Sequence, residues 1–199
     1  RYEGWMYSEL GYVYEGFTTY YGDLFLVRSG CLLPDEYLEE VNAYLLRHSE
    51  NYGRYNHGLR ESSIDTWVDG YSQSQSAPHR RVSIYAEGML QALHLDLVIR
   101  SSSLNNESPV SFDDLIRYLW KRFEQSPETP GYTQETLTLW LDKNVIVPST
   151  YKNWTDYFRI HYEQPNSIEE SLRSILPLFG CRLTTSPNED RVKHLLGLQ

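Results

Sequence analysis

Glu15 is the first residue of this 199-residue chain whose surroundings suggest chemistry. Gly11 and Thr19 lie one helical turn before and after it, and Gly22 follows about two turns on. In a helix these small residues share a face with Glu15, so another backbone can approach the carboxylate closely. An unpaired buried charge is costly, and such a carboxylate therefore needs a partner. The spacing leaves open a salt bridge, a solvated helix face or a metal ligand.

The other polar groupings are weaker candidates. His79, Arg80 and Arg81 could bind a substrate carboxylate, although such a run more often forms a solvated loop. Asp65 near Trp67 favours a simple turn. The sequence contains neither a glycine-rich phosphate loop nor a G-x-S-x-G nucleophile motif.

Composition narrows the class of protein. The chain has 27 acidic and 18 basic residues, a formal net charge of −9, which argues against nucleic acid as a partner. Apolar residues make up 40% and charged residues 23%, as in ordinary globular domains. The apolar runs are too short for a transmembrane helix. Cys31 and Cys181 could form a bridge, but two separate buried thiols are the favoured interpretation.

Hydrophobic periodicity predicts a mainly α fold. A stripe of apolar residues indicates a first helix over about 8–29, stopped by Gly30, and Pro34 marks the start of the next helix. Residues 49–81 lack periodicity and predict a long irregular segment with a short turn near 62–67. A central helix is expected over 81–101, with Glu87, Gln91 and His94 as its polar stripe. Further helices are expected over 111–124, 133–143, 153–162 and 167–177.

The end of the chain is predicted to be less regular. At most one short strand is expected, near 180–185, and residues 187–199 read as a tail. We therefore predict one unit over 1–186 followed by the 187–199 tail.

An ordered series of motifs resembles the glycyl aminopeptidase family of zinc metallopeptidases, which are thermolysin-like gluzincins. The segment YEGFTTYYGDL at 14–24 is similar to the stretch that follows the HExxH helix in that family. LVRSG at 26–30, SSIDTW at 62–67, SIYAEG at 83–88, DLVIR at 96–100 and SFDDL at 111–115 resemble later family segments in the same order. The resemblance covers roughly residues 1–185.

The resemblance implies roles for particular residues. Glu15 matches the third zinc ligand of the family, and Thr19 and Tyr20 would lie in the layer around that ligand. Tyr85 matches the tyrosine of a Y-x-x-G motif, which in related aminopeptidases donates a hydrogen bond to the oxyanion of the tetrahedral intermediate. The other interpretation of Tyr85 is a core tyrosine with a satisfied hydroxyl. The implied cofactor is zinc, and the implied substrate is a peptide with a small N-terminal residue.

The sequence departs from the family in one respect that matters. No two histidines stand four residues apart, so the HExxH pair and its glutamate base are absent. Only 14 residues precede Glu15. The histidines are His48, His57, His79, His94, His161 and His194.

We therefore expect this chain to be the C-terminal helical part of a metallopeptidase catalytic domain, inactive alone and partnered by the N-terminal part of that domain. The face bearing Gly11, Glu15, Thr19 and Gly22 is expected to be exposed, or covered by a second copy of the chain. The alternative function is a helical interaction or binding module from a non-catalytic relative. The compartment cannot be read from the sequence.

Overall fold

The computed structural model describes residues 7–69, 77–105, 107–125 and 131–186. It is mainly α, as predicted, and no strand forms in these described residues. Residues 181–186 are therefore irregular, and the short strand expected near 180–185 does not form, because a single extended segment has no neighbouring strand with which to pair. The predicted 187–199 tail lies outside the described residues.

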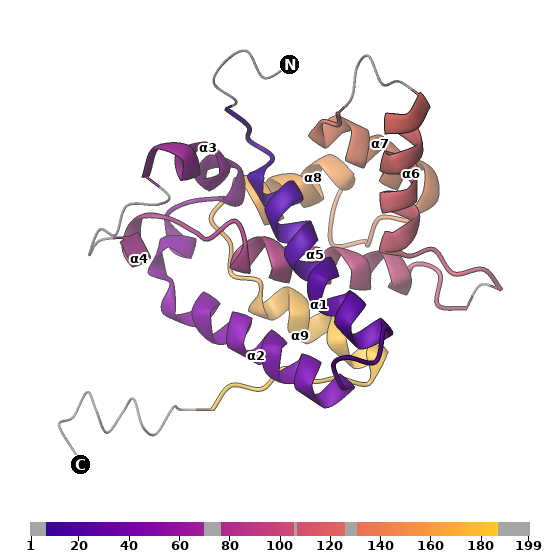
Figure 1. Cartoon of the computed structure of the whole chain (residues 1–199), viewed down its shortest axis with the longest axis horizontal. Helices are drawn as coiled ribbons and strands as arrows, with labels where there is room; N and C mark the ends of the chain where they lie inside the picture. Colours follow the sequence, from indigo (N-terminus) through magenta and orange to yellow (C-terminus); the bar gives the residue numbers. More distant parts are fainter. Residues whose placement is uncertain (1–6, 70–76, 106, 126–130, 187–199) are drawn as a thin grey trace.

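The elements follow one another with short connections (Figure 1). Besides α-helices there are two π-helices, η1 and η3, and two 3₁₀ turns, η2 and η4, among the described residues. In chain order the elements are η1 (Tyr12–Phe17), α1 (Thr18–Arg28), α2 (Pro34–Glu50), η2 (Tyr52–Tyr55), α3 (Leu59–Asp69), α4 (Ala77–Arg80), α5 (Ala86–Ser101), α6 (Phe112–Gln125), α7 (Gln134–Asn144), α8 (Trp154–Phe158), η3 (Arg159–Glu163), α9 (Glu169–Ile175) and η4 (Leu176–Phe179).

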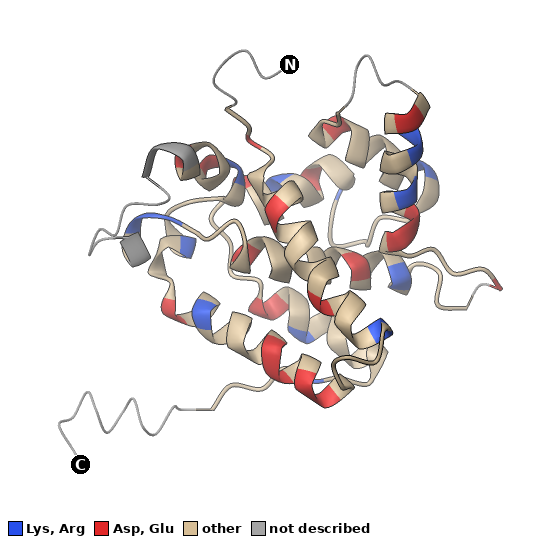
Figure 2. Ribbon diagram, viewed as in Figure 1, with Lys and Arg blue, Asp and Glu red and all other residues tan. Residues whose placement is uncertain are grey.

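Helix α5 is the centre of the fold. The continuous helix formed by η1 and α1 packs along it, and α2, α6 and α9 also contact it. Helix α5 is buried nearly all round, as its sequence predicts, although it begins at Ala86 rather than near Arg81. Charged side chains are interspersed over the surrounding helices (Figure 2). No helix in the described part of the chain is long and apolar enough to span a membrane.

Two glycines allow the first helix to contact α5 at backbone distance. A Cβ added to Gly16 would lie 2.5 Å from the Cα and carbonyl carbon of Gly88. A Cβ added to Gly88 would lie 2.8 Å from the Cα of Gly16 and 3.1 Å from the carbonyl oxygen of Tyr12. Contacts this short leave no room for any side chain at either position. The glycines of the E-G and Y-x-x-G motifs therefore face each other where the helices cross.

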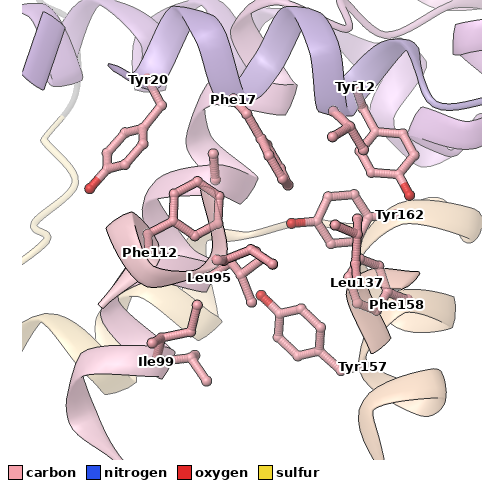
Figure 3. Close-up of a cluster of buried hydrophobic side chains, with 14 of the residues drawn as sticks. Tyr12, Phe17, Tyr20, Leu95, Ile99, Phe112, Leu137, Tyr157, Phe158 and Tyr162 are labelled. Atoms are coloured by element: carbon pink, nitrogen blue, oxygen red, sulfur yellow. The ribbon is translucent and has the colours of Figure 1, made fainter. Parts of the chain in front are cut away.

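Aromatic side chains fill the core on both sides of this crossing. Figure 3 shows Tyr12, Phe17 and Tyr20 directed from the first helix toward the side chains of α5 and its neighbours. The rings of Phe17 and Phe112 meet edge to face with centroids 4.8 Å apart, and the Tyr12 ring lies 4.6 Å from that of Tyr162. Burying each such side chain contributes about 1.5–3 kcal/mol, so this layer is a major source of stability.

Local signals in the sequence place several helix ends correctly. Gly30 adopts a φ of +77° after α1, and the Cys31 N–H donates to the Leu26 carbonyl at 2.9 Å. Pro34 opens α2, where the Leu33 N–H donates to the Glu36 carboxylate at 2.7 Å. The side chain of Asn153 caps α8 by accepting from the Asp156 N–H at 2.8 Å.

Two expectations are wrong. The segment expected to be irregular contains the eleven-residue helix α3, because tertiary packing provides what its weak periodicity lacks. Ser62 and Ser63 are buried in α3, and the Ser63 hydroxyl accepts from the Tyr12 N–H at 3.1 Å. Cys31 and Cys181 are free and exposed rather than buried, because they follow helix ends at the surface.

Substitutions at the crossing should separate close packing from helix propensity. We expect Gly16→Ala to lower the free energy of unfolding by about 3 kcal/mol or more, because its methyl group meets the backbone of Gly88. Gly22→Ala is the matched control, since its Cβ would meet nothing within 4 Å and the change should stabilise the chain by about 0.5–1 kcal/mol. Urea denaturation followed by circular dichroism measures both. Equal effects of the two substitutions would contradict the crossing.

Candidate functional site

Glu15 lies on the π-helix η1 and is half-buried. A π-turn is wider than an α-turn, and single π-turns in helices occur often at functional sites. Threonines close this wide turn, since the Thr18 hydroxyl donates to the Tyr14 carbonyl at 2.6 Å and the Thr19 hydroxyl donates to the Glu15 carbonyl at 2.8 Å. The E-G-F-T-T sequence thus supplies both the carboxylate and the hydroxyls that hold its backbone.

The carboxylate of Glu15 forms no hydrogen bond or ion pair with the residues that the structure describes. Nor do three or more His, Cys, Asp or Glu side chains in those residues converge in a group able to hold a metal ion. Glu15 therefore forms no salt bridge within the described residues, which was one of the three interpretations that its spacing left open. Glu15 can supply one ligand to a metal but needs further ligands from elsewhere.

Tyr85 precedes α5 and is 41% exposed, so it is not a core tyrosine. It lines a hollow of about 310 Å³ between the start of α5, the C-terminal half of α2 and Thr19 of α1. Tyr85 stands three residues before Gly88, and Glu15 is adjacent to Gly16, so both flank the same helix crossing. Thr19, one turn after Glu15, reaches the hollow directly. The structure thus brings these sequence-predicted residues to one region.

Other predicted residues lie elsewhere. The Tyr20 hydroxyl points into the core and donates to Asp96 at 2.5 Å, and burial together with that carboxylate raises the pKa of Tyr20. Gly11 is buried against Ile84 and Ser63, so the expected exposed face does not extend that far along the first helix. Gly22 does remain exposed.

His79 belongs to α4, where its ring stacks on Tyr52 with centroids 5.6 Å apart. It does not line the hollow beside Tyr85, and neither do Arg80 and Arg81.

His48 and Glu87, which line the hollow, belong to an ionic cluster that was not found in the sequence. His48 of α2 lies between two carboxylates, with Nδ1 2.5 Å from Glu87 Oε2 and Nε2 3.1 Å from Glu169 Oε2. The His48 side chain is 1% exposed. Because both ring nitrogens face carboxylate oxygens, the geometry favours the doubly protonated imidazolium. The cluster thereby links α2, α5 and α9.

Arg54 completes the cluster. Its Nη1 donates to the carbonyl oxygens of His48, Ser49 and Asn51 at 2.8, 3.0 and 2.8 Å, which closes the C-terminal end of α2. Its Nη2 lies 3.8 Å from Glu169 Oε1. Two cations and two carboxylates therefore lie together, all buried except the half-buried Glu169, and their charges balance.

The cluster shifts the pKa values of its members in opposite directions. Burial alone lowers the pKa of His48, but contact with Glu169 and Glu87 outweighs burial and raises it to about 9. Contact with His48 lowers the pKa of Glu169 to about 2 despite burial. Elsewhere in the core, burial lowers the pKa of His161 to about 4, so this histidine is neutral. The ionic partners, and not burial, distinguish His48.

Ser167-Ile-Glu-Glu170 resembles a capping box, but Glu169 uses its carboxylate differently. It contacts His48 and accepts from the Ser167 hydroxyl, while Glu170 is exposed at the surface. The available sequence signal was the single polar stripe of α5, in which Glu87 stands on an otherwise apolar helix. A carboxylate in that position requires a cationic partner, although sequence alone does not say which one.

Comparisons with known proteins identify relatives of this arrangement. Residues 1–91 match the model of the M61 glycyl aminopeptidase family, which agrees with the motif resemblance over that part of the chain. The fold is similar to the crystal structure of an aminopeptidase N family protein from Idiomarina loihiensis, with 30% sequence identity and a TM-score of 0.76. The similarity covers 90% of this chain but 29% of that protein. No curated protein matches the sequence significantly.

The His48 cluster predicts a pH dependence of stability. A histidine with a raised pKa stabilises the fold fully below its unfolded pKa of about 6.5, and the contribution is lost as the pH rises through about 9. We expect the free energy of unfolding to fall by about 2–3 kcal/mol between pH 6.5 and pH 9.5. Urea denaturation across this range measures the change.

His48→Gln should remove most of that slope, and His79→Gln should retain it because His79 is exposed and lies in no such cluster. A wild-type stability that does not change over this pH range would contradict the imidazolium assignment.

Proposed function

We propose that this chain, whose residues 1–91 match the M61 glycyl aminopeptidase family model, is the helical part of the catalytic domain of a zinc-dependent aminopeptidase. In this proposal Glu15 is a zinc ligand and Tyr85 stabilises the oxyanion formed during peptide hydrolysis. The observation that supports the proposal is the Gly16–Gly88 crossing, because Glu15 is adjacent to Gly16, and Tyr85, which lines the hollow, stands three residues before Gly88.

The residues present fit a zinc site in part. Glu15 offers a half-buried carboxylate that no described residue pairs, and carboxylate oxygen is an accepted zinc ligand. A catalytic zinc site needs about three protein ligands, so the others must come from a preceding HExxH segment of the parent protein. When bound, zinc polarises the substrate carbonyl and lowers the pKa of water, which are the chemical requirements of peptide hydrolysis.

Tyr85 suits the role of oxyanion donor for physical reasons. It is fixed immediately before α5, the most buried helix, and its position relative to Glu15 is set by the contact of Gly88 with Gly16. A hydrogen-bond donor held rigidly where negative charge develops stabilises the transition state more than the ground state. The ion pair between Glu87 and His48 joins the first turn of α5 to α2, and this contact restrains the backbone next to Tyr85.

The proposed substrate is a peptide with a small N-terminal residue, as the family resemblance implies. The chain spans 29% of the length of the aminopeptidase N family protein, and in this proposal it forms part of a longer parent protein. Its N-terminal part is the proposed partner of the face around Glu15 and Thr19. Self-association of the isolated chain through that face remains a prediction.

In the full-length parent enzyme, substitutions of the two proposed site residues should impair different properties. Tyr85→Phe should lower kcat about 10²-fold or more with unchanged zinc content, since one oxyanion donor is worth about 3 kcal/mol. Glu15→Gln should lose zinc, measured by metal analysis of the purified protein. Tyr7→Phe, at an exposed tyrosine, is the control and should retain both properties. Full kcat in Tyr85→Phe would exclude the oxyanion role, and a parent without zinc would favour a non-catalytic interaction module.

The 199-residue chain alone should have no peptidase activity and no tight zinc site, because it supplies one carboxylate and lacks the HExxH base. Calorimetric titration with zinc should give no stoichiometric binding at micromolar concentration. Such binding would indicate a metal site other than the one proposed.

A further inference from the structure

The hollow beside Tyr85 has the composition of a binding site for an anion. Its volume of about 310 Å³ is in the range of small-ligand sites. Its wall on α2 carries Tyr44 and Arg47, and its opposite wall carries Ser83 and Tyr85. All of these residues belong to this chain, so binding to the hollow can be tested on the chain alone.

Arg47 is the cation lining the hollow that lacks an ionic partner among the described residues. Glu87 is paired with His48, and Glu169 is paired with His48 and Arg54, so these four groups cancel. Arg47 has no hydrogen bond or ion pair with the residues that the structure describes. Its guanidinium lies over the ring of Tyr44, 5.4 Å from the centroid, which orients the side chain and leaves its N–H groups available.

Neutral groups add hydrogen-bond donors to the same hollow. The Asn51 Oδ1 accepts from the Gly53 N–H at 2.9 Å, which directs that oxygen away and leaves the amide NH₂ to donate. The Ser83 Oγ accepts from the Ala86 N–H at 3.2 Å, so its hydroxyl hydrogen can donate to a ligand. An uncancelled guanidinium with several neutral donors is the arrangement that recognises a carboxylate.

We propose that this hollow binds a carboxylate group of the peptide, with Arg47 as its cationic contact. The inference rests on the proposed function, since it takes the occupant to be a peptide lying beside Tyr85. The positively charged amino end is disfavoured next to Arg47, so the hollow receives the part of the peptide on the other side of the scissile bond. Two sources share this chemistry: the C-terminal carboxylate of a short peptide and an acidic side chain.

Binding to the 199-residue chain tests the proposal without metal or activity. We would titrate the ¹⁵N-labelled chain with triglycine, with triglycine amide and with glycyl-aspartic amide, and follow the amide resonances of Arg47, Ser83 and Tyr85. Triglycine should bind about tenfold more tightly than its amide, the effect of one charge-assisted contact. Glycyl-aspartic amide will bind as tightly as triglycine if the hollow accepts either carboxylate, and only as weakly as triglycine amide if it requires the C-terminal one.

Two arginine variants test whether Arg47 causes the preference for triglycine over its amide. Arg47→Gln should bind triglycine and its amide alike, whereas Arg122→Gln, which removes an exposed arginine from α6, should keep the tenfold preference. Salt at 0.5 M should reduce the preference, because the contact is ionic. Equal binding of all three peptides by the wild type, or a preference retained in Arg47→Gln, would overturn the proposal. Neither result depends on Glu15 or zinc, so failure here is distinct from failure of the peptidase assignment.

Discussion

The contact between Gly16 and Gly88 is the constraint on which the rest of the structure depends. It lets the first helix approach α5 at backbone distance, which brings the aromatic side chains of η1 and α1 within reach of the core around α5. The same contact fixes the positions of Glu15 and Tyr85, because each stands within one turn of a crossing glycine. Packing and site geometry therefore have a common origin, and a change at either glycine affects both.

The ionic cluster around His48 has a different energetic character from the aromatic core. Buried charges are costly to desolvate, and a buried ion pair is often no more stable than an apolar replacement. The cluster specifies the orientation of the helices, since His48 can contact Glu87 and Glu169 together only when α2, α5 and α9 are correctly oriented. The aromatic core drives association of the helices, and the cluster restricts which arrangement they adopt.

Features with local causes could be predicted from the sequence, and features with distant causes could not. Gly30, Pro34 and Asn153 act through hydrogen bonds or backbone preferences within a few residues, so they mark helix ends by their type and spacing alone. Helix α3 was missed because its support is tertiary. A Cβ on Gly58, which precedes it, would lie 2.3 Å from the Glu163 carbonyl oxygen, a contact that joins residues more than a hundred positions apart.

The residues of the candidate site also divide into those with local signals in the sequence and those that depend on distant partners. Glu15 and Tyr85 were identified through ordered motifs, whereas His48 was invisible because its carboxylate partners are 39 and 121 residues away. The direction of the Tyr20 hydroxyl likewise depended on Asp96, on another helix. Sequence pattern identified the residues that share a motif, and only the fold revealed the residues that share a partner.

The π-turn of η1 has a consequence for how the site can change in evolution. A wide turn of this kind holds one residue more than regular winding, so deletion of a single residue within Tyr12–Phe17 would restore an α-helix. Because the wide turn absorbs that extra residue, the halves of the first helix on either side of it would keep their orientation after the deletion. Tyr12 could then stay in the core while Tyr20 keeps its contact with Asp96. The change would fall on the wide turn itself, which carries Glu15, so the geometry around this carboxylate can vary in evolution while the core stays the same.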